Sequence, residues 1–390
     1  MRATDARAAD AATLARLGDL EGRAARWSDQ VKRVDEALAH LSGDHDLAAA
    51  RAALDAIGAG GPDDPTVKQA KAAIDQLQTA FHALFDDLEI GRTRAALGDA
   101  QRALAEAAPA ATYAADCRAR LDELEKIAGS DMARAAAGRV RLAASIRSTQ
   151  ANEPVAVGAF WLDQCEASNG EFQRFLAELP AARATVERLL PALPGLDHAS
   201  IDEAMQRLAT APPGLAASKR PDPRLPIEQV SYAQAVVYLA RREKQLPTLE
   251  EWWLAAKGSL TVLSEHRRFP WSDSPTARLE QALGTDQVCA RMKRPMAVDV
   301  GGVAIGFGSA KVHHLAGNVE EWTAAAPAGG GRLESRVVGG GYDDEEESRF
   351  SGEQPRYVDV TADPEFSVGF RGVLRPRDFF AAKGLAPRAF

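Results

Sequence analysis

The chain has 390 residues, of which 46% are hydrophobic and 26% are charged, a composition typical of globular proteins with two or three domains. Its formal net charge of −8 argues against a general binder of nucleic acid or of anionic membranes. No apolar run is long enough to span a membrane, and no apolar segment follows the polar N-terminus. We therefore expect a cytoplasmic protein without a membrane span or a secretory signal.

The three cysteines, Cys117, Cys165 and Cys289, lie far apart in the sequence. They form no Cys-x-x-Cys pair and no zinc-type Cys/His spacing. We expect three reduced and mostly buried thiols, as in proteins of a reducing compartment.

Residues 1–148 are rich in Ala, Arg, Leu, Glu and Asp, which favour helices. One apolar stripe has steps that alternate between three and four residues, and it consists of Val67, Ala70, Ile74, Leu77, Phe81, Leu84 and Leu88. Such a stripe occupies one helix face and needs a partner helix. The breaks along this region predict four or five helices, arranged as a bundle, a coiled-coil arm or irregular repeats of the tetratricopeptide kind. We expect this domain to act as a scaffold or dimerisation element, with a partner-binding groove as the alternative.

Residues 149–390 contain more Pro, Gly and Trp, and their elements are shorter. The segment 155–162 predicts a strand, and Ser168 predicts the start of a helix that buries Phe172, Phe175 and Leu176. Residues 177–225 are interpreted as a partly helical insertion. Further on, Thr248 and Glu251 have the spacing of a capping box at the start of another helix.

Several motifs in this second region follow one another in a characteristic order. They are Phe160–Phe172, Val230–Ala235, Leu246–Gly258, Phe269–Ser272, Ala316–Thr323, Arg336–Tyr342 and Ser367–Arg371. In this order they resemble the formylglycine-generating-enzyme (sulfatase-modifying factor) family over residues 152–375. The resemblance implies an elaborated C-type-lectin-like fold with little regular secondary structure. The expected fold class is thus α+β, with an all-α helical domain (1–148) followed by a formylglycine-generating-enzyme-like domain (149–390).

Most of the motif residues are expected to maintain the fold. We expect the large aromatic side chains to be core anchors, namely Trp252, Trp271, Trp322 and Phe370. Arg371 is expected to hold neighbouring carbonyls or a carboxylate with its planar guanidinium. The run Gly339–Gly341 allows backbone conformations that other residues avoid, and Glu321 and Trp322 are placed at a turn.

The resemblance implies a copper-dependent oxidation only in family members with two cysteines after the glycine run. In this chain that segment, residues 342–352, contains no cysteine. Thiolates are the soft ligands that copper(I) requires, and carboxylates do not replace them. We therefore expect no copper and no oxidase activity.

A second branch of the family consists of non-haem-iron sulfoxide synthases, in which an N-terminal helical domain supplies three histidines. The histidines of the helical region here are His40, His45 and His82, and their spacing does not match that pattern. We expect solvated or helix-end histidines and no iron.

Calcium is the metal that the resemblance favours. Carried over from the family, its ligands would be the carbonyl oxygens of Gly317 and Val319 and the side chain of Glu321. His314 stands where the family has Asp or Asn, which weakens the expected site because Ca²⁺ prefers oxygen ligands. The neighbouring pair His313–His314 is an alternative transition-metal site, although adjacent histidines point in different directions.

The segment after the glycine run is strongly acidic and lies at the substrate-binding face that the resemblance implies. An ordinary solvated loop is one interpretation of this run. The other is a binding face for a basic peptide or a cationic protein partner. Its candidate residues are Tyr342, Asp343, Asp344, Glu345, Glu346, Glu347, Arg349, Arg356 and Tyr357.

The sequence thus predicts a non-catalytic sensor, adaptor or regulatory protein. In it a helical domain displays a formylglycine-generating-enzyme-like binding module, and self-association through the helical domain is expected. One alternative is a divergent metal-dependent oxidase or oxygenase that uses His313, His314 or the N-terminal histidines. Another is a structural scaffold or a variable-type recognition protein of the same fold.

Overall fold

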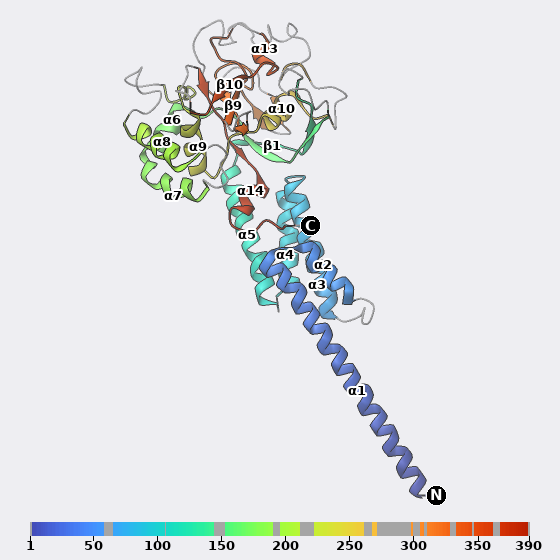
Figure 1. The fold of residues 1–390 in the computed structure, drawn as a ribbon. Helices are drawn as coiled ribbons and strands as arrows, with labels where there is room; N and C mark the ends of the chain where they lie inside the picture. The colour runs from blue at the N-terminus through green and yellow to red at the C-terminus, as the bar shows by residue number, and fades with distance from the viewer. Residues whose placement is uncertain are drawn as a thin grey trace. The chain divides into compact units, whose positions relative to one another are not determined.

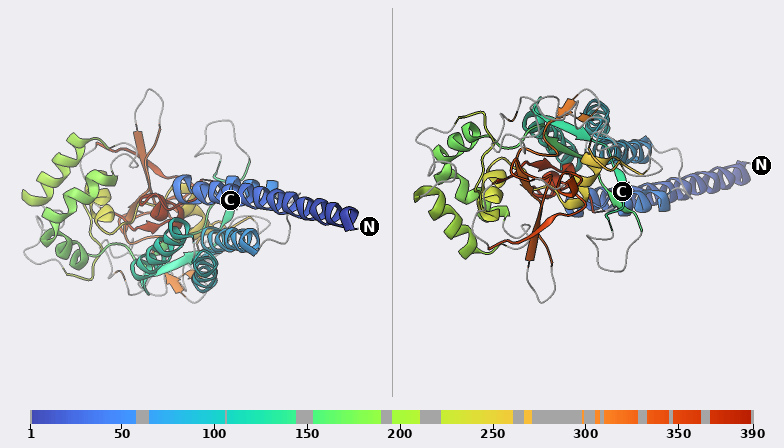
Figure 2. Two further views of the ribbon diagram at one scale, coloured as in Figure 1. Left: turned by 90° about the horizontal axis from the view of Figure 1, so that it is seen from below. Right: turned by 90° about the horizontal axis from the view of Figure 1, so that it is seen from above.

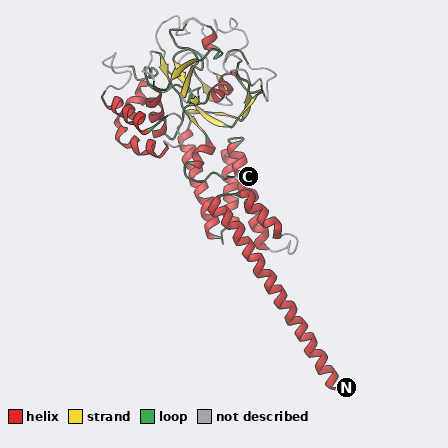
Figure 3. Cartoon of the chain, in the orientation of Figure 1, coloured by secondary structure: helices red, strands yellow, loops and turns green. Residues whose placement is uncertain are grey.

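The computed structural model describes most of the chain, as two compact units (Figures 1 and 3). The described residues are 2–57, 65–105, 107–143, 153–189, 196–210, 222–260, 267–270, 298, 305–307, 310–327, 333–344, 347–361 and 367–388. The first unit combines Met1–Leu84, Glu89–Glu123 and Phe380–Phe390, and the second combines Phe85–Leu88 and Leu124–Phe379.

The first unit is helical, as the sequence predicts. Its elements are α1 (Arg2–Ala39), a π-helical turn (His40–Asp44), α2 (Leu47–Ala56), α3 (Pro65–Phe85), α4 (Ile90–Ala103) and most of α5 (Ala108–Ala128). The side chains of the predicted stripe are all buried, and those from Val67 to Leu84 lie on α3, which confirms the shared face for these six residues. Helix α3 ends at Phe85, however, so Leu88 lies beyond the helix, in the left-handed region with φ of +55°.

The C-terminal segment completes this helical unit. The ring of Phe380 packs edge-on against Phe81 of α3, with 6.1 Å between the ring centroids. The hydroxyl of Tyr113 in α5 donates a hydrogen bond of 3.0 Å to the carbonyl of Leu385. His45 stacks on the same Tyr113 ring at 4.3 Å. The core of the helical unit is therefore built from both ends of the chain.

The second unit begins earlier than the composition shift near residue 150. Strand β1 (Met132–Ala135) pairs antiparallel with β4 (Phe160–Asp163), which also pairs with β12 (Val373–Leu374). Strand β2 (Gly138–Val140) pairs with β3 (Val155–Val157). The segment 155–162, predicted as one strand, thus forms two strands, β3 and β4, that join different sheets.

A five-stranded sheet carries most of the motif residues. Its strand order is β10 (Arg356–Asp359), β9 (Leu333–Val338), β7 (Glu320–Trp322) and β11 (Val368–Gly369), and β8 (Ala326–Pro327) also pairs with β9. Only β7 and β11 run parallel among these pairs. Glu321 and Trp322, expected at a turn, lie in strand β7. A separate hairpin joins β5 (Ile305–Phe307) and β6 (Ala310–Val312).

The helices of the second unit begin at side-chain caps. Helices α6 (Asn169–Ala177), α9 (Tyr232–Arg241) and α10 (Leu249–Lys257) each start with a capping box, formed by Ser168, Ser231 and Thr248 respectively. The predicted caps at Ser168 and Thr248 are confirmed. Two shorter helices are α13 (Glu347–Phe350) and α14 (Pro376–Ala381).

The predicted insertion contains helices α7 (Leu179–Leu189) and α8 (His198–Thr210). Both pack against α9, and the three lie together in each view (Figure 2). Ile201, Ala204 and Leu208 of α8 are buried in the same core as Phe172 and Phe175.

Large aromatic side chains form the core of the second unit. Trp252, Trp322 and Phe370 are all buried, which confirms their predicted role, while Trp271 lies outside the described residues. The indole of Trp322 donates a hydrogen bond of 2.8 Å to the carbonyl of Val230. Within the described ranges, no helix combines the length and apolarity that a membrane crossing requires.

Candidate functional site

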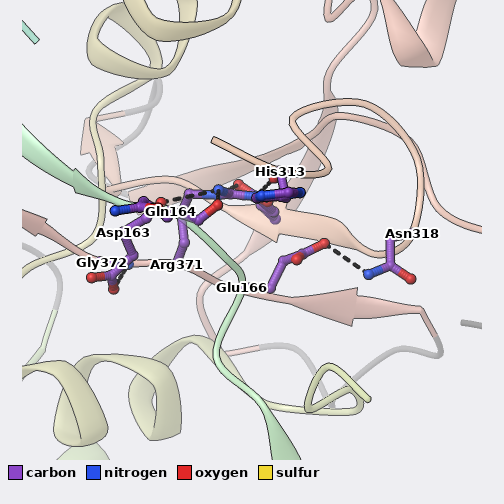
Figure 4. Close-up of polar contacts among 8 residues, drawn as sticks. Asp163, Gln164, Glu166, His313, Asn318, Arg371 and Gly372 are labelled. Carbon is purple, nitrogen blue, oxygen red and sulfur yellow. Dashed lines mark hydrogen bonds and ion pairs between the residues drawn. The ribbon is translucent and has the colours of Figure 1, made fainter. Parts of the chain in front are cut away.

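Strand β7 carries two consecutive glutamates, and their side chains have different partners. Glu321 faces the interior, where both carboxylate oxygens accept hydrogen bonds of 2.8 Å from Nε of Arg371. Arg371 also donates to the carbonyls of Asp163, Gln164 and His313 (Figure 4). The two side chains are 1% and 0% exposed. Arg371 thus holds both a carboxylate and carbonyls, as predicted, and it joins three distant segments.

A second buried carboxylate, Glu166, lies near this pair. Its Oε1 accepts a hydrogen bond of 3.0 Å from the side-chain amide of Asn318 (Figure 4). Its Oε2 is buried and has no hydrogen-bond partner in the described part of the chain. Burial raises the pKa of Glu166 to about 7, against the opposing effect of Arg371. Burial likewise raises the pKa of Glu321 to about 7.

One guanidinium cannot neutralise two buried carboxylates. Because Arg371 bonds Glu321 directly, we assign the negative charge to Glu321 and the proton near neutral pH to Glu166. We name the set Glu166, Asn318, Glu321 and Arg371 the inner cluster.

Asn318 and the glycine run connect the inner cluster to the acidic loop. The carbonyl of Asn318 accepts a hydrogen bond of 2.8 Å from the backbone N–H of Tyr342. Gly339 and Gly340 have φ of +93° and +69°, a region that other residues rarely adopt. A Cβ at Gly340 would lie only 2.9 Å from the Phe350 ring. The glycines therefore let the chain turn closely under the loop, as the sequence predicts.

Beyond the glycine run, Tyr342 and the two aspartates adopt defined positions. The hydroxyl of Tyr342 donates a hydrogen bond of 2.9 Å to Oε2 of Glu228. Oδ2 of Asp344 accepts a hydrogen bond of 2.7 Å from the backbone N–H of Gly341, whereas Asp343 is exposed. Burial raises the pKa of Glu228, and the charge of Asp343 raises it further. Negative charge is therefore concentrated around Tyr342.

The two candidate arginines face Glu320, the other glutamate of β7. Nε of Arg356 lies 3.0 Å from Oε2 of Glu320, and Nη2 makes a second, shorter contact. Arg349 lies 3.9 Å from Oε1. Burial raises the pKa of Glu320, against the lowering effect of Arg356. We name the set Glu228, Glu320, Tyr342, Asp343, Asp344, Arg349 and Arg356 the loop cluster.

The remaining candidate residues are placed differently. Tyr357 is 50% exposed and lies on the opposite face of β10 from Arg356, with the guanidinium of Arg336 at 5.0 Å from its ring centroid. Glu347 begins α13, and its side chain lies outside the described residues, as do Glu345 and Glu346.

Sequence reasoning missed Glu228 and Glu320 as members of this site. Glu320 had a usable signal, because it is the acidic neighbour of Glu321 within the motif Ala316–Thr323. Glu228 had none, since it reaches Tyr342 from 114 residues away.

The predicted calcium ligands lie beside the inner cluster. Both side-chain oxygens of Glu321 accept hydrogen bonds from Arg371, so Ca²⁺ at this carboxylate would have to displace the guanidinium and approach its positive charge. His314 is buried next to this carboxylate. The described donor set therefore does not fit Ca²⁺ in this arrangement, and the ligand assignment stays a prediction. Within the described ranges, no cluster of three or more His, Cys, Asp or Glu side chains is arranged to hold a metal ion.

Comparison with known proteins identifies the class of the second unit. The family model for the sulfatase-modifying factor enzyme 1-like domain matches residues 118–376. The chain therefore belongs to this family, and the helical region precedes its family domain.

Similarity to individual proteins is more limited. A formylglycine-generating enzyme from Thermomonospora curvata is 38% identical over 68 residues, which are 17% of this chain and 21% of that enzyme. The crystal structure of CarF aligns at 16% identity with a TM-score of 0.36, covering 63% of this chain and 98% of that chain. Treponema denticola variable protein 1 aligns at 15% identity with a TM-score of 0.39, covering 63% and 95%.

Proposed function

We propose that the family domain of this protein is a binding module for a basic peptide or protein segment. The observation that carries this proposal is the loop cluster, in which carboxylates gather around Tyr342 directly after the glycine run.

The cysteine positions favour binding over thiol-based oxidation. Residues 342–352 contain no cysteine, and the chain has cysteines only at 117, 165 and 289. Cys117 is buried in α5 of the helical unit. Cys289 lies outside the described residues. A copper(I) site of the thiolate kind has no ligands in this loop.

The charge arrangement favours a cationic partner. Arg349 and Arg356 are both directed to Glu320, and the charge of Asp344 is near enough to raise the pKa of the same carboxyl, so two acidic groups face the two guanidinium groups. Asp343 is exposed, and its charge is strong enough to raise the pKa of Glu228. A lysine or arginine side chain placed here would relieve repulsion among these carboxylates and gain charge-assisted hydrogen bonds.

The test is fluorescence anisotropy with two labelled peptides of equal length, one rich in Lys and Arg and one rich in Asp and Glu. The full chain should bind the basic peptide, and binding should weaken as salt is raised. The double variant Asp343→Asn/Asp344→Asn keeps the side-chain acceptor for Gly341 and should bind about tenfold more weakly.

A matched control removes the same number of charges elsewhere. Asp202→Asn/Glu203→Gln changes two exposed acidic residues of α8 and should bind like the wild type. An equal loss of affinity for the basic peptide in both double variants would mean that binding depends only on the net charge of the protein. The loop cluster would then not be a binding site. Absence of binding to the basic peptide would also overturn the proposal.

For the helical unit, we propose self-association through α1. Leu17 and Leu20 are 49% and 56% exposed, and they begin a sequence stripe with steps of three and four residues that continues to Val31 and Val34. Exposed leucines at such spacing suit a helical partner. Light scattering after gel filtration should give a dimer or larger species, and Leu17→Lys/Leu20→Lys should give a monomer. A monomeric wild type would exclude this role.

A further inference from the structure

A cavity of about 390 Å³ opens in the second unit, lined by residues that the loop cluster does not use. Its lining includes Asp163, Cys165, Glu166, Glu171, Arg242 and Lys244. The volume is in the range of small-molecule sites. Asp163 ends β4, Cys165 and Glu166 lie between β4 and α6, Glu171 is in the first turn of α6, and Arg242 and Lys244 follow α9.

On one side of the cavity, Glu166 presents an unsatisfied acceptor. The residue is 1% exposed, and one oxygen is engaged by Asn318. The other oxygen, Oε2, is buried and has no hydrogen-bond partner in the described ranges. A buried carboxylate oxygen without a donor is costly, and such atoms in native proteins are usually satisfied by a ligand or an ordered water.

Arg242 presents an unsatisfied donor to the same cavity. Its guanidinium lies over the ring of Tyr238, 3.9 Å from the centroid, which fixes its plane. Nη2 makes a hydrogen bond of 3.5 Å to the carbonyl of Glu171. Nη1 is buried, and no partner for it occurs among the described residues. A guanidinium held in this way can present two parallel N–H groups to a carboxylate.

Three other charged side chains that line the cavity, Asp163, Glu171 and Lys244, are engaged within the protein. Nζ of Lys244 lies 2.6 Å from Oδ1 of Asp163. The carboxylate of Glu171 accepts hydrogen bonds of 2.9 Å from the backbone and the hydroxyl of Ser168. Of the buried side-chain N and O atoms that line the cavity in the described ranges, Oε2 of Glu166 and Nη1 of Arg242 are left without a hydrogen-bond partner.

We propose that this cavity binds a small zwitterion, a free α-amino acid, with its ammonium group on Glu166 and its carboxylate on Arg242. An ammonium group beside Oε2 would favour the ionised form of Glu166, which would release its proton to solvent on binding and then accept from the ammonium. The ligand's carboxylate would accept from Nη1. Neither group alone satisfies both atoms, so recognition requires the two charges in one ligand. This ligand site is additional to the binding face of the loop cluster.

The first experiment is isothermal titration calorimetry of the full chain with each of the twenty protein amino acids. At least one should bind saturably at one site per chain. For the best binder, the amine that lacks its carboxylate and the acid that lacks its ammonium should each bind at least about tenfold more weakly. Equal binding of either analogue would overturn the two-point recognition. No saturable binding by any amino acid would overturn the proposal.

Two neighbouring arginines of α9 and its cap provide a matched pair of variants. Arg242→Gln removes the proposed carboxylate partner and should weaken binding at least about tenfold. Arg241→Gln changes a residue that pairs with Glu178 and should keep wild-type affinity. Glu166→Gln, checked for folding by circular dichroism, should weaken binding of the amino acid because an amide cannot neutralise its ammonium. Equal affinities of the Arg242 and Arg241 variants would refute the site.

Cys165 reports on occupancy independently of the affinity measurements. It is half-buried and lines the cavity, so bound amino acid should slow its alkylation by N-ethylmaleimide, measured by peptide mass spectrometry. Ligand binding without protection of Cys165 would place the ligand elsewhere. Arg242→Gln should leave basic-peptide binding unchanged, so a failure of this inference is distinguishable from a failure of the proposed function.

Discussion

Glu320 and Glu321 are neighbours on one short strand, yet the clusters that they join differ in burial and in the origin of their partners. Glu321 pairs with Arg371, a residue of another family motif, and both side chains are almost completely buried. Glu320 pairs with Arg349 and Arg356, whose side chains are 24% and 27% exposed. Alternation along the strand directs the two carboxylates to opposite faces of the sheet.

This difference separates a buried cluster that maintains the fold from a partly exposed cluster that a ligand can reach. The inner cluster holds three segments together through one guanidinium. A substitution in this cluster therefore lowers the stability of the fold. The loop cluster consists of partly exposed ion pairs, which contribute less to stability and respond to salt. Function can therefore change at Glu320 without loss of the structure that Glu321 maintains.

The most severe test of this comparison removes the guanidinium of the inner cluster. Arg371→Met should lower the free energy of unfolding by about 3–5 kcal/mol, because it leaves Glu321 buried without a partner. Urea denaturation followed by circular dichroism measures the loss. Arg356→Met is the matched control, and its free energy of unfolding should fall much less. Similar losses for the two variants would remove the distinction between the clusters.

A pH series tests the assignment of a proton to Glu166. Its pKa is about 7 in the folded protein and 4.5 ordinarily, so the folded state binds the extra proton between these values. The resulting stabilisation is complete below pH 4.5 and is lost as the pH rises through about 7. We expect a loss of roughly 1–3 kcal/mol across this window.

The variant Glu166→Gln mimics the protonated side chain and should remove most of that pH dependence. Urea denaturation at several pH values measures both proteins. An unchanged slope in the variant would assign the proton to another group, with Glu321 the first candidate.

A smaller effect should follow from changing the loop cluster. Arg356→Gln should cost about 1–2 kcal/mol, because Glu320 loses its best charged partner but keeps Arg349. The same variant should bind the basic peptide more tightly, since the face becomes more negative. Denaturation and anisotropy together measure these opposite changes. Weaker peptide binding would instead make Arg356 part of the contact surface.

The smallest expected effect concerns calcium. Because Arg371 occupies both oxygens of Glu321, millimolar Ca²⁺ or its removal by EDTA should leave the Tm unchanged. Differential scanning calorimetry measures this directly. A higher Tm in Ca²⁺ that is abolished in Glu321→Gln would instead support the ligand set predicted from the family.

Local features of the fold were predictable from the sequence. The capping box of Thr248 and Glu251 follows from a three-residue spacing, and its hydrogen bonds of 2.7 and 3.2 Å confirm it. The burial of Trp322 and the role of Arg371 follow from motif residues. The family pattern, however, places the loop residues near one another without indicating which of them pair.

Contacts between distant segments were not predictable in this way. Glu251 also receives two hydrogen bonds of 2.6 Å from Arg375, across 124 residues, and no local pattern indicates them. The same holds for Tyr342 with Glu228 and for the two unsatisfied groups that line one cavity. Such pairings depend on how the strands assemble, and a single sequence does not reveal that assembly.

The C-terminal segment has a consequence for the order in which the protein is made. Phe380 and Leu385 contact Phe81 and Tyr113 in the helical unit, and they are synthesised after the whole of the second unit. The first helices therefore leave the ribosome well before the residues that complete their core have been synthesised. The core of the helical unit therefore cannot be complete until residues 380–385 have been synthesised.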